Sequence, residues 1–353
     1  MRTSWRVKVL IVSAMAFSGA SAASRASPQK PLFESEAVLA LRIEAPFSNL
    51  VKSAPRSKDS FDARLQLLGP EPETYAIELS PRGISRRNPA NCDFPPLRIT
   101  FKEKPGDGSL FKGQRSLKLA THCRSDIGSR RLNLLEFAAY RMFNVLTPLS
   151  FRVRMAEIDY VEARTGVIRI HRTGYLIEDI HDVAARNGLR EIKTLRTEVE
   201  QLDAVATARS DLFQYMIGNL DWSDRAAAPG TDCCHNVKIL GALRDDLRNL
   251  VPVAYDFDQS GFVDAPYAVP PPGVPVKTLR TRYYRGTCRF NAQATEVARS
   301  MLEKRADVLS SIGGTPFLGD GDKATATKYV VSFFEEIGSP EDMKRRILAH
   351  CRD

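Results

Sequence analysis

Residues 251–261 read VPVAYDFDQSG, and this stretch decides how the rest of the chain is interpreted. Its first half is rich in strand-forming and small apolar residues, which predicts a buried β-strand. Two carboxylates, Asp256 and Asp258, then flank Phe257. In an extended segment, side chains two residues apart point to one face, so both carboxylates are expected on the same face. Because burial penalises an uncompensated carboxylate, a cation is expected opposite them.

Two polar motifs precede this stretch. The spacing of apolar residues over 198–220 predicts a helix that ends at Gly218, and Asp221 follows it in the motif MIGNLDWS. Asn236 begins a predicted strand in HNVKIL. Taken alone, Asp221 is better explained as a turn residue at a helix end. The order of Asp221, Asn236 and Asp256 is what makes the set informative.

The first half of the chain adds a lysine and a helix carboxylate. Lys118, in RSLKLATHC, points to the opposite face of a short predicted strand from Leu117 and Leu119. Glu136 lies in a helix predicted over 129–146 that is apolar almost all round, so its carboxylate needs a cation. Lys118 is the expected partner. The alternative is that each residue is a solvated surface charge, and for either residue alone that interpretation is the better one.

This set matches the parts needed for phosphoryl transfer. A lysine that pairs with a helix glutamate holds nucleotide phosphates, an aspartate accepts or orients the hydroxyl proton, and an asparagine with a second aspartate holds Mg²⁺. In chain order the residues are Lys118, Glu136, Asp221, Asn236 and Asp256.

On these motifs the chain resembles the atypical secreted protein kinases, especially the CotH-like (spore coat protein H) family. GNLDWS also looks like the GNxDR loop of the secretory-pathway kinases that phosphorylate casein-like proteins. The resemblance spans roughly residues 75–290, and its other sharp parts are ELSPRGISRR, HNVKIL and AYDFDQSG. The chain departs from common kinases in having no His-Arg-Asp triplet and no kinase glycine-rich loop. Trp222 replaces a common basic residue, and Asp258 stands where Asp-Phe-Gly has glycine.

The resemblance implies roles for individual residues. Asp221 would be the catalytic aspartate, and Asn236 and Asp256 would hold the metal, with Asp258 as a further carboxylate. Four more residues would serve the nucleotide: Lys118 and Glu136 as the phosphate-binding pair, Gly83 in the turn over the phosphates, and Arg82 beside it. Glu178 would lie where the lobes join and where adenine is usually held. The implied cofactors are ATP or another nucleotide, with Mg²⁺ or Mn²⁺.

The predicted elements divide the chain into two lobes. Residues 36–178 are β-rich with one internal helix, and residues 179–353 are mainly helical. The expected fold is therefore α+β, two-lobed and protein-kinase-like, with a nucleotide-binding N-lobe and a metal-binding, catalytic C-lobe.

The N-terminus predicts export. Residues 1–22 combine basic residues, a short apolar run and small residues before Ala22, as in a secretory signal peptide, and residues 23–35 form a polar linker. No other segment approaches membrane-spanning length, so no membrane anchor is expected in the mature form. The protein is expected to be periplasmic or secreted.

Six cysteines in an exported chain favour disulfides. Cys92 and Cys123 form the natural first pair, and Cys233 or Cys234 with Cys288 is the next candidate. A zinc site built from Cys233, Cys234, His235 and Cys288 competes with this interpretation, but adjacent ligands are poorly spaced for zinc.

Charge and composition exclude some functions. The formal charge is +9, and loss of the leader with Arg2, Arg6 and Lys8 reduces it to +6, without the dense basic stripe that nucleic acid needs. Arg280, Arg282 and Arg285 either grip an acidic or phosphorylated partner or form a solvated surface.

The sequence thus predicts an exported kinase-like protein that transfers phosphate from a nucleotide to a protein or glycan hydroxyl. The alternative is a non-catalytic scaffold or binding protein of the same fold. No histidine is paired with a serine or cysteine in a hydrolase-like motif, so a hydrolase triad has no support.

Overall fold

The computed structural model describes residues 30–227, 231, 233–243 and 245–352. The leader predicted for 1–22 and the linker residues 23–29 lie outside the described part. At the end of the predicted linker, residues 31–33 form the short 3-10 helix η1, in which Leu32 and Phe33 are buried in the core of the N-terminal half.

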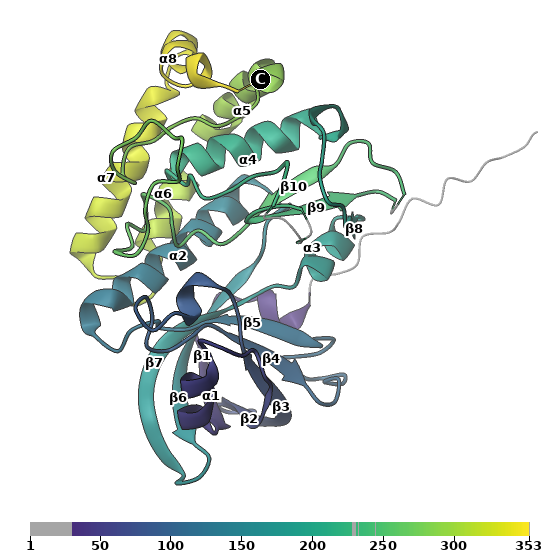
Figure 1. The fold of residues 1–353 in the computed structure, drawn as a ribbon, viewed down its shortest axis with the longest axis vertical. Coiled ribbons are helices and arrows are strands. Elements are labelled where there is room, and N and C mark those ends of the chain that lie inside the picture. The colour runs from purple at the N-terminus through teal and green to yellow at the C-terminus, as the bar shows by residue number, and fades with distance from the viewer. Residues whose placement is uncertain (1–29, 228–230, 232, 244, 353) are drawn as a thin grey trace, which may run out of the picture.

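Seven strands of the N-terminal half close into a barrel (Figure 1). Their order is β1-β2-β3-β4-β5-β7-β6, and the barrel closes where β1 runs parallel to β6. Alternate side chains of β1 are buried, as the period of a half-buried strand requires, and they join the barrel core. The strands are β1 (Leu39–Ala45), β2 (Phe61–Leu68), β3 (Glu73–Pro81), β4 (Leu97–Phe101), β5 (Ser116–Ala120), β6 (Val153–Glu162) and β7 (Val167–Ile177).

The long helix α2 (Ile127–Leu146) lies between the barrel and the helical half (Figure 1). Asp126 caps it by accepting a hydrogen bond from the backbone N–H of Ser129. It packs against α6 on one side and against β6 and β7 on another, which explains why its sequence is apolar almost all round. The helix that carries Glu136 is therefore held by both halves of the molecule.

The C-terminal half is mainly helical and contains a small sheet of order β10-β9-β8. The sheet strands are β8 (Arg190–Glu191), β9 (Val237–Gly241) and β10 (Val251–Ala254). The helices are α3 (Ile180–Arg186), α4 (Ala204–Met216), α5 (Asn291–Glu303), α6 (Arg305–Gly313), α7 (Asp320–Glu336) and α8 (Pro340–Arg346). The predicted boundary after residue 178 falls in the connection between β7 and α3.

The predicted α+β class is confirmed, with a β-rich N-terminal lobe and a mainly helical C-terminal lobe. Besides α2, the first lobe has a short helix that was not predicted, α1 (Phe47–Ser53). Within the described residues, no helix combines the length and the apolar character needed to cross a membrane.

Candidate active site

The loop after α4 places Asp221. The helix ends at Met216, and Gly218 has a left-handed φ of +62°, where an added Cβ would lie 2.2 Å from Tyr329 Oη. The Asn219 side chain then accepts a hydrogen bond from the backbone N–H of Asp221 at 3.0 Å. The close packing at Gly218 and the hydrogen bond from Asp221 to Asn219 therefore hold the loop that carries Asp221 in place.

Three side chains hold the Asp221 carboxylate. His235 Nε2 lies 2.7 Å from Oδ1, and Asn236 Nδ2 and Gln259 Nε2 donate to Oδ2 at 3.0 and 2.7 Å. Asn236 Nδ2 also lies 2.7 Å from the backbone oxygen of Asp221. The hydrogen bond to Asp221 raises the pKa of His235, although burial opposes this. The predicted convergence of Asp221 with Asn236 is thus seen in the structure.

The antiparallel pair β9 and β10 brings Asn236 close to Asp256. Ala254 pairs with Val237, and Tyr255 N–H donates to the Asn236 carbonyl oxygen at 3.0 Å. Asp256 is the next residue, and its negative charge raises the pKa of His235, beside Asn236. Asn236 and Asp256 have left-handed φ values of 52° and 62°, which aspartate and asparagine adopt more readily than other non-glycine residues.

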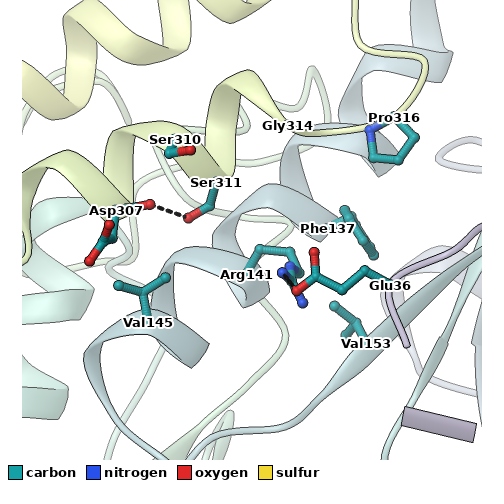
Figure 2. A pocket seen from close by; sticks show the side chains of 10 residues that line it. All are labelled: Glu36, Phe137, Arg141, Val145, Val153, Asp307, Ser310, Ser311, Gly314 and Pro316. Carbon is teal, nitrogen blue, oxygen red and sulfur yellow. Dashed lines mark hydrogen bonds and ion pairs between the residues drawn. The ribbon is translucent and has the colours of Figure 1, made fainter. Parts of the chain in front are cut away.

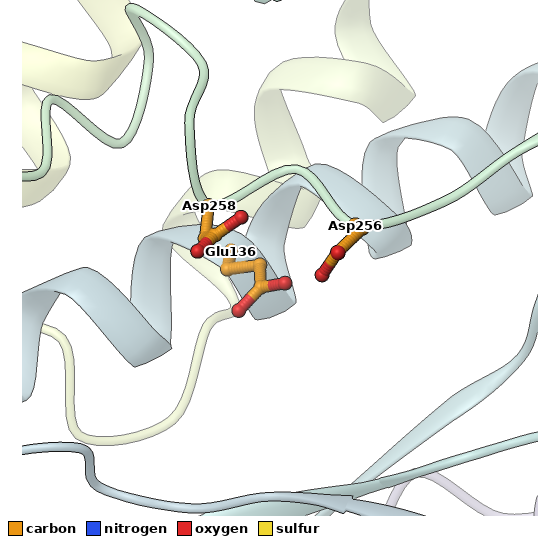
Figure 3. A group of neighbouring side chains, drawn as sticks. All are labelled: Glu136, Asp256 and Asp258. Carbon is orange, nitrogen blue, oxygen red and sulfur yellow. The ribbon is translucent and has the colours of Figure 1, made fainter. Parts of the chain in front are cut away.

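The left-handed backbone at Asp256 also changes the arrangement expected of the DFD stretch. Strand β10 ends at Ala254, so Asp256 and Asp258 are not successive residues on one face of an extended segment, as the sequence suggested. Their carboxylates converge nevertheless: one oxygen of each and one of Glu136 lie within 4.8 Å of one another (Figure 3). Asp256 is anchored by Tyr140, whose Oη accepts its backbone N–H at 2.9 Å.

The cation opposite these carboxylates is Arg86. Its guanidinium lies 2.9 Å from Glu136 Oε2, 2.9 Å from Asp256 Oδ1 and 3.2 Å from Asp258 Oδ2. Burial opposes the charge of Arg86, but the three carboxylates outweigh it and raise its pKa further above the ordinary value. The expected partner of Glu136 was Lys118, and this expectation is wrong: in the described structure no ion pair joins Lys118 to Glu136, and a bidentate arginine takes that place.

Asp258 is another buried member of this group. Its side chain is 8% exposed and accepts a hydrogen bond from Tyr267 Oη at 2.9 Å. Burial raises the pKa of Asp258 to about 7, and the charges of Asp256 and Glu136 act in the same direction while Arg86 opposes them. Asp258 is therefore a structural acid behind Arg86 rather than a group directed at solvent.

Lys118 lies between two aromatic rings. Its Nζ is 5.3 Å from the ring centroid of Phe151 and 5.4 Å from that of Tyr255, the residue before Asp256. Burial, together with the positive charge of Arg82, lowers the pKa of Lys118 to about 8. Within the described residues Lys118 has no carboxylate within ion-pair distance. The Lys118 ammonium thus has no ion-pair partner in this part of the chain, and it lies next to Tyr255, which follows the end of β10.

The turn after β3 carries Arg82 and Gly83. Arg82 N–H donates to the Pro96 carbonyl oxygen at 2.9 Å, which holds the start of the turn on the barrel. Gly83 has a φ of +81° and no atom within 4 Å of an added Cβ. The turn then enters the 3-10 helix η2 (Ser85–Arg87), which delivers Arg86 to the carboxylates.

Glu178 lies at the junction of the lobes, between β7 and α3, but its carboxylate is already engaged. Arg186 Nε donates to Oε1 at 3.0 Å, and the backbone N–H of Arg152 donates to Oε2 at 2.9 Å. Burial raises the pKa of Glu178 even so. The side chain of Glu178 thus ties the two lobes together instead of facing a nucleotide.

An oxygen-rich donor set suits a hard divalent cation such as Mg²⁺. Nδ2 of Asn236 is engaged by Asp221, so Oδ1 is the amide atom that remains for a ligand. The Asp256 side chain is 33% exposed, against 2% for Glu136. Asn236 Oδ1 and the Asp256 carboxylate therefore fit a metal, whereas Glu136 and Asp258 are turned to Arg86.

The disulfides agree with one predicted pair and contradict the other. Cys92 is bonded to Cys123 as predicted, but Cys288 is bonded to Cys351, and Cys233 to its neighbour Cys234. Strand-like pairing of Thr287 with Arg352 brings the C-terminus to Cys288, which the sequence did not reveal. With these cysteines in disulfides, the competing zinc site has no thiolate ligands.

Two of the three arginines of LRTRYYRG, Arg282 and Arg285, are structural, whereas Arg280 is 42% exposed and pairs with Asp264. Arg282 is 8% exposed and packs on the ring of Tyr329, with Glu336 at 3.4 Å. Arg285 donates to the carbonyl oxygens of Leu220 and Trp222, on either side of Asp221. These two residues are therefore neither a grip for an acidic partner nor a solvated surface.

A separate cavity of about 320 Å³ lies on the other side of α2 (Figure 2). Its walls come from α2, α6, β6 and the segment before β1, and they include the ion pair between Arg141 and Glu36. None of the predicted site residues lines this cavity.

Sequence reasoning missed three residues of the site: Arg86, His235 and Gln259. The sequence pointed to two of them, because His235 directly precedes Asn236 and Gln259 directly follows Asp258, and both neighbours were predicted site residues. Arg86 lies within the quoted ELSPRGISRR segment, but nothing there separates it from Arg82 or Arg87.

No protein-family model matches the chain, and no curated protein sequence matches it. The resemblance to the spore-coat kinases therefore stays a prediction from motifs. Among solved structures, a proinflammatory kinase of Helicobacter pylori, CtkA, is similar with a TM-score of 0.36 and 9% sequence identity. The match covers 72% of this chain and 89% of that one. The roles proposed below rest on the geometry of this chain's own residues.

Proposed function

We propose that the chain is an exported phosphotransferase that moves a phosphoryl group from a nucleotide, bound with Mg²⁺ or Mn²⁺, to a hydroxyl of a protein or glycan. The observation that carries the proposal is the convergence of Asp221, in the loop after α4, with Asn236 and Asp256 at the ends of β9 and β10. Lys118, which has no ion pair among the described residues, lies next to Tyr255 in the same region.

Asp221 is the group that accepts the hydroxyl proton. A carboxylate offers about four lone-pair directions, and His235, Asn236 and Gln259 use three of them. One direction on Oδ1 remains for the substrate hydroxyl. The hydroxyl oxygen forms the new bond to phosphorus, the bond from phosphorus to the leaving oxygen of the nucleotide breaks, and the proton passes to Asp221.

Lys118 and Arg82 supply positive charge for the nucleotide phosphates. Both act on one region, since the charge of Arg82 lowers the pKa of Lys118, and negative phosphates placed there would relieve the repulsion. Asn236 Oδ1 and Asp256 would hold the metal, which when bound neutralises charge that develops on the phosphates.

A transfer assay tests this proposal. The exported chain is incubated with γ-labelled ATP or GTP, Mg²⁺ or Mn²⁺, and an acidic protein such as casein as acceptor. Asp221→Asn keeps the size of the side chain but removes the base, and incorporation should fall by roughly 10²–10⁴-fold. Asp246→Asn, on the surface beside Arg248, is the matched control and should transfer phosphate normally. Equal incorporation by wild type and Asp221→Asn would contradict the proposal.

Arg86 favours a second candidate function, a non-catalytic nucleotide-binding scaffold. Its contact with Asp256 Oδ1 occupies one oxygen of a proposed metal ligand. In that case the wild-type chain binds nucleotide, and no acceptor or metal ion produces transfer above the Asp221→Asn background.

A further inference from the structure

Arg86 occupies the place among Glu136, Asp256 and Asp258 where an external cation would be bound. Each of its three guanidinium nitrogens is within 3.2 Å of a different carboxylate. Arg86 is 8% exposed, so these contacts are largely shielded from water. The chain thus carries its own counter-ion for the carboxylate group.

We propose that Arg86 competes with a divalent cation for Asp256, so that the chain binds the metal only as Arg86 withdraws. This inference rests on the proposed function, because it takes Asp256 as a metal ligand. A guanidinium and a divalent cation held by the same carboxylate would repel each other strongly in a partly buried site. One of the two has to leave.

The charges of the group couple the departure of Arg86 to the arrival of the metal. Glu136 and Asp258 are buried, and one carboxylate oxygen of each lies within 4.8 Å of the other and of one Asp256 oxygen. If Arg86 withdrew alone, these carboxylates would face each other without compensation, which is costly in a buried site. A divalent cation supplies the compensating charge and makes the withdrawal possible.

The contacts of Arg86 allow it to withdraw without unfolding the turn. Its guanidinium bonds are to the side chains of Glu136, Asp256 and Asp258, so no backbone hydrogen bond depends on them. Its neighbour Arg87 points elsewhere and donates to backbone oxygens of Gly83, Ala54 and Ser57. Arg87 anchors the turn, and Arg86 closes the site.

A binding titration with Mn²⁺ alone tests the competition. Arg86→Gln removes the internal cation and should bind Mn²⁺ at least about tenfold more tightly than wild type, by electron paramagnetic resonance or calorimetry. Arg248→Gln removes a surface arginine that is 82% exposed and pairs with Asp246, and it should match wild type. A folded Arg86→Gln chain that binds Mn²⁺ no more tightly than wild type overturns the inference, as does the same gain in Arg248→Gln.

Chemical modification of the wild-type chain tests it without any substitution. Phenylglyoxal modifies accessible arginines, and fragment mass spectrometry separates Arg86 from Arg87. Arg86 should be protected in metal-free protein and become reactive as Mn²⁺ is added to saturation. Mn²⁺ binding with Arg86 still protected, or an absence of Mn²⁺ binding at any concentration, overturns the inference.

These measurements need neither a nucleotide nor an acceptor, so the two proposals can fail separately. Exposure of Arg86 by Mn²⁺ in a chain that never transfers phosphate supports the competition and refutes the enzymatic function. Phosphate transfer by a chain in which Arg86 stays protected at every Mn²⁺ concentration supports the enzymatic function and refutes the competition.

Discussion

Asn236 donates its side-chain amide to two oxygens of Asp221, the backbone carbonyl at 2.7 Å and the carboxylate Oδ2 at 3.0 Å. Asn236→Asp would replace this donor with a second carboxylate, which repels the Asp221 carboxylate and no longer holds it in place. We expect phosphate transfer to fall by roughly 10²-fold or more. A transfer assay checks this, with circular dichroism to verify the fold. Unchanged transfer by a folded Asn236→Asp chain would show that this contact does not serve the reaction.

Lys118 should be needed for nucleotide binding but not for stability. Lys118→Met removes a charge that burial disfavours, so the free energy of unfolding should stay the same or rise, while nucleotide affinity falls. In wild type, affinity should also decline as pH rises above about 8, the pKa to which burial lowers Lys118, because the neutral amine no longer attracts phosphate.

Fluorescence titration of a labelled nucleotide between pH 7 and 10 measures both effects. Lys118→Arg is the matched control: it stays charged, so its affinity should not decline over this range. If Lys118→Met binds nucleotide as tightly as wild type, the prediction is contradicted, and Lys118 only packs between Phe151 and Tyr255.

Asp258 should make the protein less stable as pH rises from about 4 to about 7. Its pKa is raised in the folded state to about 7, chiefly by burial, so the folded chain binds more protons than the unfolded chain across that window. Asp258→Asn cannot ionise and should flatten this part of the stability profile. Urea unfolding at several pH values gives the slope. An equal slope in both proteins would mean that Asp258 is already ionised at low pH, as a strong pair with Arg86.

The disulfide between Cys288 and Cys351 should stabilise both the fold and the Asp221 loop. It links residues that are 63 positions apart, and its loss should cost about 2–5 kcal/mol. It also holds Arg352 over the ring of Trp222, next to Asp221. The midpoint of urea unfolding should be lower for Cys351→Ser, and equal to that of wild type once both are reduced. A midpoint unchanged under oxidising conditions would contradict this.

Local patterns explain how much of the fold could be predicted. Periodicity located α2 to within two residues at its start, because a helix that is buried on several sides is apolar over its whole length. The end of α4 near Gly218 followed from the left-handed conformation that glycine permits. The closure of the strands into a barrel depends on the parallel pairing of β1 with β6, distant in sequence, and no local pattern encodes it.

The order of the motifs in the sequence predicted which segments of the chain meet at the site. It did not predict which side chains contact each other there, because that depends on how far each side chain extends. Asn236 and Asp256 converge because β9 and β10 pair, and the loop after α4 brings Asp221 to Asn236, which the order of these residues suggests. The partner of Glu136 depends on which cation reaches it across the lobes. Arg86 reaches it from the turn after β3, whereas Lys118 on β5 is held between aromatic rings.

The central claim is metal-dependent nucleotide binding at Asp256, and equilibrium binding of ATP tests it most directly. Calorimetry of the wild-type chain with Mg²⁺ and with EDTA should show binding that is at least about tenfold tighter with the metal, a difference of about 1.4 kcal/mol. Asp256→Asn should bind ATP with the same weak affinity in both conditions. Wild-type protein that binds no ATP, or whose Mg²⁺ dependence survives in Asp256→Asn, would contradict the account.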